Sequence, residues 1–300
     1  MCPVFFRVLP AGGVSCRLCL HIHHDGRCNL ESRLDRLFAS LREKGSTALM
    51  PFVCAGHPAP GSLNEVIPAL EKAGASAVEI GFPFSDPIAD GPVIAAAMHE
   101  ALQNGITPQK IFEQVRTLRD SCRLALIAMV SVSIITRMGT ENFMHRAAEA
   151  GFDGIIIPDL TVEQSAPFRE AADKEGLSFV LLISPTTPDD RAVQIARSCT
   201  GFCYLLARTG ITGERKEAPE IAERVAVIRQ GCAIPIACGF GISTADHVQA
   251  VTRHADAAIV GSALVRRLAE AGENAPAAAY SYTAELCRGL YVRDEREETG

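Results

Sequence analysis

One pattern repeats along almost the whole chain and restricts its fold. A short apolar run is followed by a loop rich in glycine or polar residues, and then by a stretch with helical spacing of apolar residues. The apolar runs do not alternate with polar residues, which is typical of parallel strands covered on both faces. Eight such units in about 240 residues match the size of a (β/α)₈ TIM barrel, and an open doubly wound sheet is the alternative. The predicted strands are 48–54, 76–80, 124–130, 154–157, 178–183, 201–206, 235–238 and 257–260.

The segments between these strands carry the predicted helices. An extra helix is expected at 31–44, where Leu34, Phe38 and Leu41 recur with helical spacing, and it should close the N-terminal end of the barrel. No linker divides the body, so the chain is predicted to be one α/β catalytic barrel domain at 31–290 with a charged tail at 291–300. The other predicted helices are 62–73, 93–104, 108–119, 141–150, 162–175, 189–198, 219–229 and 244–251.

The first 30 residues differ from the rest and are expected to be a disordered extension. They include Cys16, Cys19 and Cys28 with several histidines, but these residues are crowded without the intervening loop that is common in structural zinc modules. We therefore predict no metal site. A targeting segment is an alternative interpretation of this acid-poor start.

Composition narrows the class of protein. A hydrophobic content of 48% in 300 residues is enough for a large core, and the net charge of −6 argues against a nucleic-acid surface. No run reaches the roughly 18 apolar residues of a spanning helix. Most of the eleven cysteines lie in or beside apolar segments, as expected of buried thiols in a reducing compartment, so a cytoplasmic location is predicted.

The segment 79–92, with the sequence EIGFPFSDPIADGP, is the best candidate for catalysis. Glu79 lies near the C-terminal end of a buried strand, where apolar surroundings raise a carboxyl pKa and allow the group both to donate and to accept protons. Asp86 and Asp90 follow in a loop that three prolines stiffen. In a barrel of this kind the C-terminal ends of the strands carry the active site.

Two glycine-bearing turns predict a phosphate site. The turn at 239–243 follows the seventh strand and the turn at 261–264 follows the eighth, each just before a helical stretch. Glycine permits close approach of a phosphate, and amides at the start of a helix supply donors. The glycine-rich segment 208–215 after the sixth strand is predicted to be a lid over a bound substrate.

Taken together, these motifs resemble the α subunit of tryptophan synthase over about residues 31–270. The resemblance implies cleavage of indole-3-glycerol phosphate to indole and glyceraldehyde 3-phosphate in L-tryptophan biosynthesis, with no metal or cofactor in this chain. It also implies a β-subunit partner in an α2β2 complex, with pyridoxal phosphate in that partner. The matching segments are 79–92, 156–160, 204–213, 239–243 and 261–262.

The resemblance also implies roles for individual residues. Glu79 would protonate indole C3 and assist the retro-aldol step, while Asp90 would hydrogen-bond the indole N–H and stabilise positive charge on the ring. Thr212 in the lid would help to place Asp90, and Pro83 and Asp86 would contact the partner. The phosphate would be held by Gly213, Gly241, Gly261 and Ser262 with Phe240 beside them, and Phe52, Tyr204 and Ile259 would line the indole pocket.

Four positions depart from the pattern of that family. His57 stands where Asp is usual, Ser131 and Ser133 where Tyr and Asn are typical, and Thr161 where Pro is usual. We interpret His57 as a solvated turn residue rather than a pH-sensitive contact. Because these changes remove polar groups and ring area, turnover or coupling between subunits could differ from the family's.

Three other functions stay open from the sequence. The chain could be a free-standing indole-glycerol-phosphate lyase, or a ligand-binding allosteric partner with weakened catalysis, although Glu79 and Asp90 argue against the latter. Another phosphosugar enzyme is a third alternative, and the absence of a lysine at a strand end disfavours Schiff-base chemistry.

Overall fold

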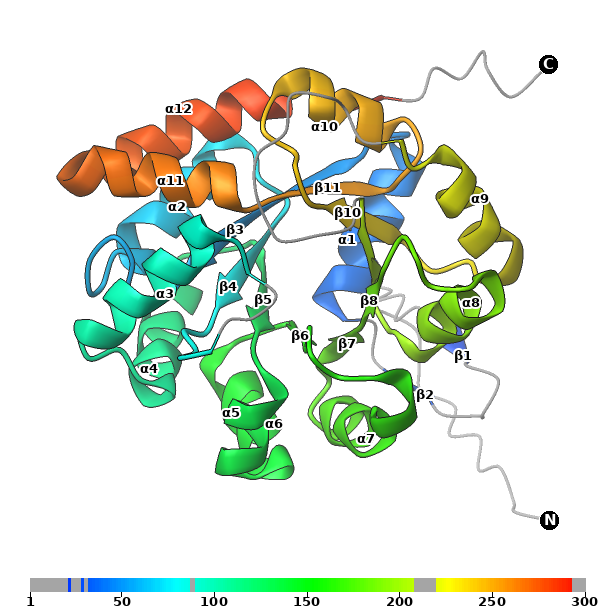
Figure 1. Cartoon of the computed structure of the whole chain (residues 1–300), viewed down its shortest axis with the longest axis horizontal. Helices are drawn as coiled ribbons and strands as arrows, with labels where there is room; N and C mark the ends of the chain where they lie inside the picture. The colour runs from blue at the N-terminus through cyan, green and yellow to red at the C-terminus, as the bar shows by residue number, and fades with distance from the viewer. Residues whose placement is uncertain (1–20, 23–27, 30–31, 87–89, 208–219, 293–300) are drawn as a thin grey trace, which may run out of the picture. The chain divides into compact units, whose positions relative to one another are not determined.

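The computed structural model describes residues 21–22, 28–29, 32–86, 90–207 and 220–292 (Figure 1). The chain separates into two compact units, Met1–Glu31 and Ser32–Gly300. In the first unit β1 (His21–Ile22) pairs antiparallel with β2 (Cys28–Asn29). The rest of residues 1–30, with the Cys16 and Cys19 motif, lies outside the described residues, so the expectations for it stay predictions.

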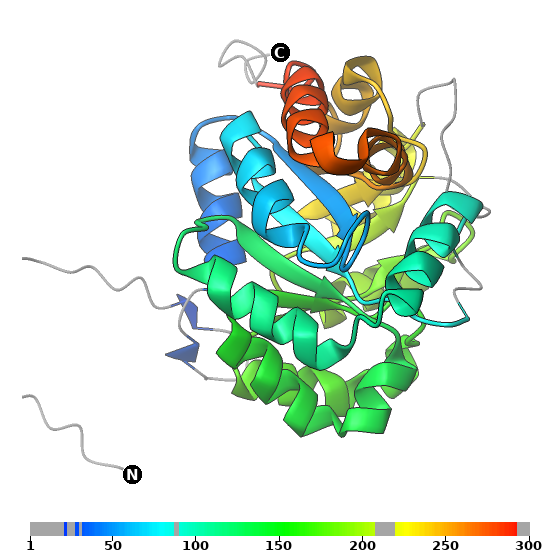
Figure 2. The ribbon, with the colours of Figure 1, turned by 90° about the vertical axis from the view of Figure 1, so that its left-hand side faces the viewer.

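The second unit is built on a ring of parallel strands surrounded by helices, as Figures 1 and 2 show from two directions. Neighbouring strands follow the order β7-β6-β5-β4-β3-β11-β10-β9-β8, and β7 continues along the chain into β8. The predicted barrel is therefore confirmed, and the open doubly wound sheet is wrong. The strands are β3 (Ala48–Cys54), β4 (Ala77–Gly81), β5 (Ala125–Met129), β6 (Gly154–Ile156), β7 (Ser178–Val180), β8 (Leu182–Ile183), β9 (Cys203–Leu206), β10 (Ile236–Gly239) and β11 (Ala257–Val260).

One predicted strand, 178–183, is divided at Leu181 into β7 and β8. The first piece pairs with β6 and the second with β9, so the backbone changes neighbours in the middle of the run. The Leu181 amide donates to Cys199 Sγ at 3.2 Å instead of to a strand, and its carbonyl accepts from the Tyr204 amide at 3.2 Å. The barrel closes at this point.

Helices cover the outside of the ring. The predicted helix at 162–175 is divided into the 3₁₀ turn η1 (Val162–Gln164) and α7, and the sequence analysis missed α5 and α12 and gave no bounds for α11. Because α5 begins with β-branched residues, its apolar side chains do not distinguish it from a continued strand. The helices are α1 (Arg33–Glu43), α2 (Leu63–Ala73), α3 (Pro92–Gln103), α4 (Pro108–Arg119), α5 (Val132–Met138), α6 (Thr140–Ala150), α7 (Ala166–Lys174), α8 (Asp189–Ser198), α9 (Ala222–Gly231), α10 (Ala245–Thr252), α11 (Ser262–Ala271) and α12 (Ala275–Cys287), with the 3₁₀ turn η2 (Gly272–Asn274) between the last two.

Helix α1 closes the N-terminal end of the barrel, as predicted. Its buried Leu34 and Phe38 belong to the same apolar cluster as Met50 and Ile127 inside the ring. The rings of Phe38 and Phe202 have their centroids 6.0 Å apart. This end is therefore filled by side chains, and open volume is left to the opposite end of the strands.

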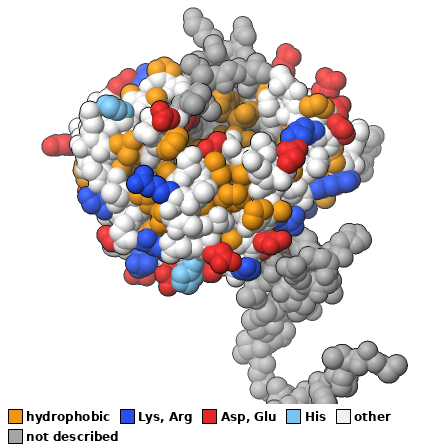
Figure 3. All heavy atoms as spheres, turned by 60° about the horizontal axis from the view of Figure 1, so that its bottom comes forward, with side chains coloured by type: hydrophobic (Ala, Val, Ile, Leu, Met, Phe, Trp, Pro, Cys, Tyr) orange, Lys and Arg blue, Asp and Glu red, His pale blue; other side chains and the backbone are white. Residues whose placement is uncertain are grey.

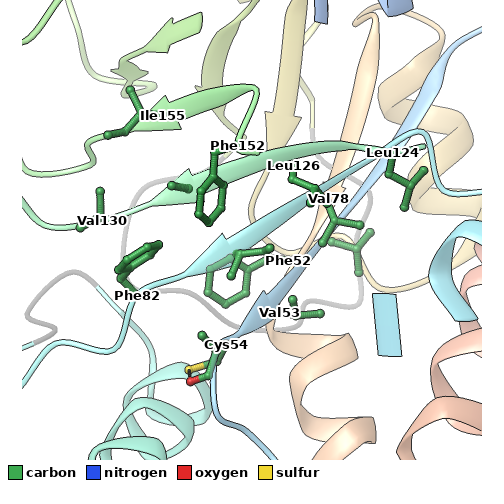
Figure 4. Packing of buried hydrophobic residues seen from close by; sticks show 14 of the residues in the cluster. Phe52, Val53, Cys54, Val78, Phe82, Leu124, Leu126, Val130, Phe152 and Ile155 are labelled. Atoms are coloured by element: carbon green, nitrogen blue, oxygen red, sulfur yellow. Dashed lines mark hydrogen bonds between the residues drawn. The ribbon is translucent and has the colours of Figure 1, made fainter. Parts of the chain in front are cut away.

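A second cluster packs the strands against the helices. Figure 4 shows part of it, including Val78 and Leu126 on neighbouring strands and Phe82 just after β4. The Phe82 ring lies 5.6 Å from that of Phe112 and 5.9 Å from that of Phe152, centroid to centroid. These contacts anchor the start of the loop that leads from β4 to Asp90.

The surface agrees with the charge balance of the sequence. On the face in Figure 3, basic and acidic side chains are interspersed rather than gathered by sign. Among the described residues, no helix is both long and apolar enough to cross a membrane. Residues Tyr291 and Val292, at the start of the predicted tail, are tied to the barrel: Thr47 Oγ1 donates to the Tyr291 carbonyl at 3.0 Å, and Val292 forms a β-bridge with Ser46.

Candidate active site

Strand periodicity directs Glu79 into the barrel. In β4, Ala77 belongs to the interior cluster, whereas Val78 and Ile80 pack in the outer layer against the helices. Since successive side chains of a strand point to opposite faces, Glu79 points inward. In the parallel ladders it is paired with Phe52 of β3 and Ile127 of β5. The strand that carries the carboxyl is held on both sides.

A cavity of about 510 Å³ opens at the C-terminal ends of the strands. It brings together ten residues that the sequence assigned to catalysis, substrate binding or partner contact. Pro83 is buried and does not line it, and Thr212 and Gly213 lie outside the described residues. The predicted residues that line the cavity are Phe52, Glu79, Asp86, Asp90, Tyr204, Phe240, Gly241, Ile259, Gly261 and Ser262.

The environment of Glu79 favours the neutral carboxylic acid over the carboxylate. Its side chain is fully buried, and neither oxygen has a hydrogen-bond partner among the described residues. Burial disfavours the charged form and raises the pKa of Glu79 well above its usual range, as the sequence predicted. A neutral carboxyl at the edge of an apolar cavity can donate a proton to a bound molecule.

Asp90 has a different environment although it lines the same cavity. It stands just before Gly91, the N-cap of α3, and is only partly buried. Burial raises the pKa of Asp90 to about 6, so the group is mainly ionised at neutral pH. One cavity thus holds a carboxyl whose neutral form is strongly favoured by burial and a second one with a pKa of about 6, and this difference separates proton donation from charge stabilisation.

Aromatic side chains fill the space beside the carboxyls because two glycines leave room for them. A Cβ on Gly81 would overlap the Phe52 ring, and a Cβ on Gly239 would overlap the hydroxyl and ring of Tyr204. Burial raises the pKa of Tyr204 well above its usual range. The phenol therefore stays protonated, and the cavity offers flat apolar walls next to Glu79.

The opposite part of the cavity is suited to an anion. Phe240 and Gly241 have positive φ angles of 87° and 78°, and this turn lines the cavity together with Gly261 and Ser262. Helix α11 begins at Ser262, so the unpaired amides and positive dipole of its first turn lie at the cavity wall. The sequence predicted this combination of turns, although it did not predict the extent of α11.

The wall between β5 and β6 contains residues that the sequence did not assign to the site. Ser131 Oγ donates to Asp159 Oδ2 at 2.7 Å, and the Val132 amide donates to Asp159 Oδ1 at 2.8 Å. Both Ser131 and Asp159 line the cavity, as do Ser133 and Val130. The sequence signal that could have placed Asp159 in the site was its position just after the fourth predicted strand. Thr161, in contrast, is exposed and does not line the cavity.

The interpretation of His57 as a solvated turn residue is wrong. Its exposed fraction is 5%, and its Nδ1 lies 3.0 Å from Glu100 Oε2 on α3. The preceding Gly56 has a φ of 84° and packs closely against Ile106 and Ala101, which brings the turn under α3. His57 is buried because the turn folds back against this helix.

Comparisons with known proteins agree with one another. The family model described as "Tryptophan synthase alpha chain" matches residues 38–290. A tryptophan synthase alpha chain from a Synechococcus species is 44% identical over 243 residues, which are 80% of this chain and 90% of the relative. A structure of Mycobacterium tuberculosis tryptophan synthase superposes with a TM-score of 0.80 at 29% identity, covering 88% of this chain and 99% of that chain. The tryptophan synthase subunit alpha of Legionella pneumophila gives a TM-score of 0.77 at 31% identity, covering 86% and 98%.

Proposed function

Since this chain belongs to the tryptophan synthase alpha chain family, and is therefore a lyase of L-tryptophan biosynthesis that cleaves indole-3-glycerol phosphate, we propose how its residues perform that cleavage. The observation that carries the proposal is the pair of unlike carboxyls in one cavity: a buried Glu79 whose pKa is raised well above its usual range, and Asp90 with a pKa of about 6.

Glu79 is the general acid and base in this proposal. Its proton passes to C3 of the indole ring, which leaves a positive charge shared with the ring nitrogen. The hydroxyl on the adjacent chain carbon then gives its proton to the Glu79 carboxylate, and the bond between that carbon and C3 breaks. The bonding electrons return to the ring, so indole and glyceraldehyde 3-phosphate leave and Glu79 is protonated again.

Asp90 stabilises the intermediate. Its carboxylate accepts a hydrogen bond from the indole N–H and balances the positive charge that develops when C3 is protonated. The pKa of about 6 supports this role, because the group is charged at neutral pH yet lies in a partly desolvated site where its interaction with a cation is strong.

The remaining residues hold the substrate. Phe52, Tyr204 and Ile259 form the walls of the indole pocket, and Gly241, Gly261 and Ser262, with Phe240 beside them, bind the phosphate through backbone amides. We extend the proposal to Thr212 and Gly213 as lid residues that close over the substrate, although both lie outside the described residues. These steps need no metal or bound cofactor.

We further propose that the chain works as the α subunit of an α2β2 complex in the cytoplasm, with a β subunit that carries pyridoxal phosphate. Asp86 would contact that subunit, and its exposure at the mouth of the cavity supports this, whereas Pro83, the other predicted contact, is buried in this chain. The seven cysteines described in the barrel are free thiols, which fits a reducing compartment. Residues 31–290 would form the catalytic domain, with 1–30 as an extension and the tail after it.

Release of indole from indole-3-glycerol phosphate by the purified chain, with and without a tryptophan synthase β subunit, tests the proposal. We expect slow release that rises strongly with the partner and is lost in Glu79→Gln and in Asp90→Asn. Glu65→Gln, which makes the same chemical change on the exposed face of α2, is the matched control. Fast release without the partner would indicate a free-standing lyase, and full activity of the Glu79 variant would overturn the assigned mechanism.

A further inference from the structure

The cavity spans the mouth of the barrel from one side to the other. In the ring of strands, β10 and β11 stand opposite β5 and β6, with β4 between β5 and β3. The anion-binding turns belong to the first pair, and the wall made by Val130, Ser131 and Ser133 follows β5. Glu79 on β4 lies along the path between the two ends.

This layout fixes which end of a bound substrate faces which wall. A phosphate on Gly241 and Gly261 anchors the glycerol chain at the β10–β11 side, and protonation by Glu79 requires ring carbon 3 beside β4. The benzene ring is the part of the substrate farthest from the phosphate, so it points across the mouth towards Ser131 and Ser133.

The wall at that end is built from short side chains, and the hydroxyl of Ser131 and the carboxylate of Asp159 already have partners, whereas Ser133 is exposed. Ser131 Oγ donates to Asp159 and accepts from the Ser133 amide at 3.2 Å. Both oxygens of Asp159 accept hydrogen bonds, one from Ser131 and one from the Val132 amide. Val130 is buried and apolar beside them. An apolar group placed here takes no hydrogen bond from Ser131 or Asp159, and Ser133 is exposed, so no buried polar group is left unpaired.

We propose that the wall formed by Val130, Ser131 and Ser133 sets substrate specificity by accepting a small apolar substituent on the benzene ring. The chain then cleaves indole-3-glycerol phosphates that carry a methyl group on ring carbon 5 or 6, as well as the unsubstituted compound. This inference rests on the proposed function and adds a substrate class to it.

The test compares kcat/KM for indole-3-glycerol phosphate and for its 5-methyl and 6-methyl derivatives, with the β subunit present. For the unmodified chain, at least one methylated substrate is expected to reach within about threefold of the parent compound. Ser133→Leu fills the wall without removing the backbone hydrogen bond to Ser131, and should lower the ratio of methylated to parent kcat/KM about tenfold or more. Ser133→Ala keeps the space open, and should leave that ratio unchanged.

The outcomes separate this inference from the proposed function. If the unmodified chain cleaves the parent compound but cleaves both methylated ones a hundredfold more slowly, the inference alone is overturned. A Ser133→Leu variant that lowers both rates equally overturns it too, since the wall would then not discriminate between the substrates. If neither parent nor methylated compound is cleaved, the proposed function fails and the inference fails with it.

Discussion

A Glu79→Gln variant is expected to change both the pH dependence of the free energy of unfolding and the turnover rate, because both depend on the buried Glu79 carboxyl. Burial raises the pKa of Glu79 in the folded chain, so the folded state keeps a proton that the unfolded state releases. The stability that this proton contributes is complete below the unfolded pKa of about 4.3, and is lost as pH rises towards the folded pKa. Within that window the free energy of unfolding falls by about 1.4 kcal/mol per pH unit. Glutamine does not titrate and lacks this slope.

Urea unfolding of the unmodified chain and of Glu79→Gln at a series of pH values above about 4.5 measures the effect. Other titrating groups are common to both proteins, so their contributions cancel in the difference to a first approximation. The variant should gain stability relative to the unmodified chain by about 1.4 kcal/mol for each pH unit, while its kcat for indole release falls by about 10²- to 10⁴-fold. Parallel stability curves would refute the raised pKa, and unchanged kcat would refute the catalytic role.

Three further changes test other parts of the structure. In the unmodified chain kcat should fall as the pH drops through about 6, because protonation neutralises Asp90. The pH profile of Asp90→Asn should lack this fall, with kcat lowered about 10²-fold, and a fall that persists in the variant would show that another group titrates there. Gly239→Ala should raise KM about tenfold, because the new Cβ pushes the Tyr204 ring into the cavity. Adding Tyr204→Phe should restore part of the affinity, since the Tyr204 hydroxyl oxygen lies nearest to the new Cβ, and steady-state kinetics of the single and double variants measure both effects. Asp153→Ala removes the acceptor of two arginines and of the Leu126 amide, and should lower the free energy of unfolding in urea by about 3 kcal/mol with kcat unchanged; a loss below about 0.5 kcal/mol would show that this network does not stabilise the barrel.

Local sequence determines much of this site because the relevant patterns are short. The apolar run at 76–80 gives both a buried strand and the face on which Glu79 lies, and the turns after β10 and β11 carry their glycines in sequence. The burial of His57 could not be predicted in this way, since it depends on packing against α3, a distant helix. The hydrogen bond between Ser131 and Asp159 joins two loops that are 28 residues apart. The departures at Ser131 and Ser133 were visible in the sequence and were expected near the substrate, but the hydrogen bonds that these residues make there were not predicted.

The change of neighbours at Leu181 also divides the chemistry of the barrel. Residues before it supply β3 to β7 and the two carboxyls proposed for catalysis, and residues after it supply β8 to β11 and the two turns proposed to bind the phosphate. A gene cut between these two blocks would produce one fragment with acid–base groups but no phosphate anchor, and another with the reverse. Neither fragment alone could carry out the reaction, so complementation of the two fragments would report directly on reassembly of the ring.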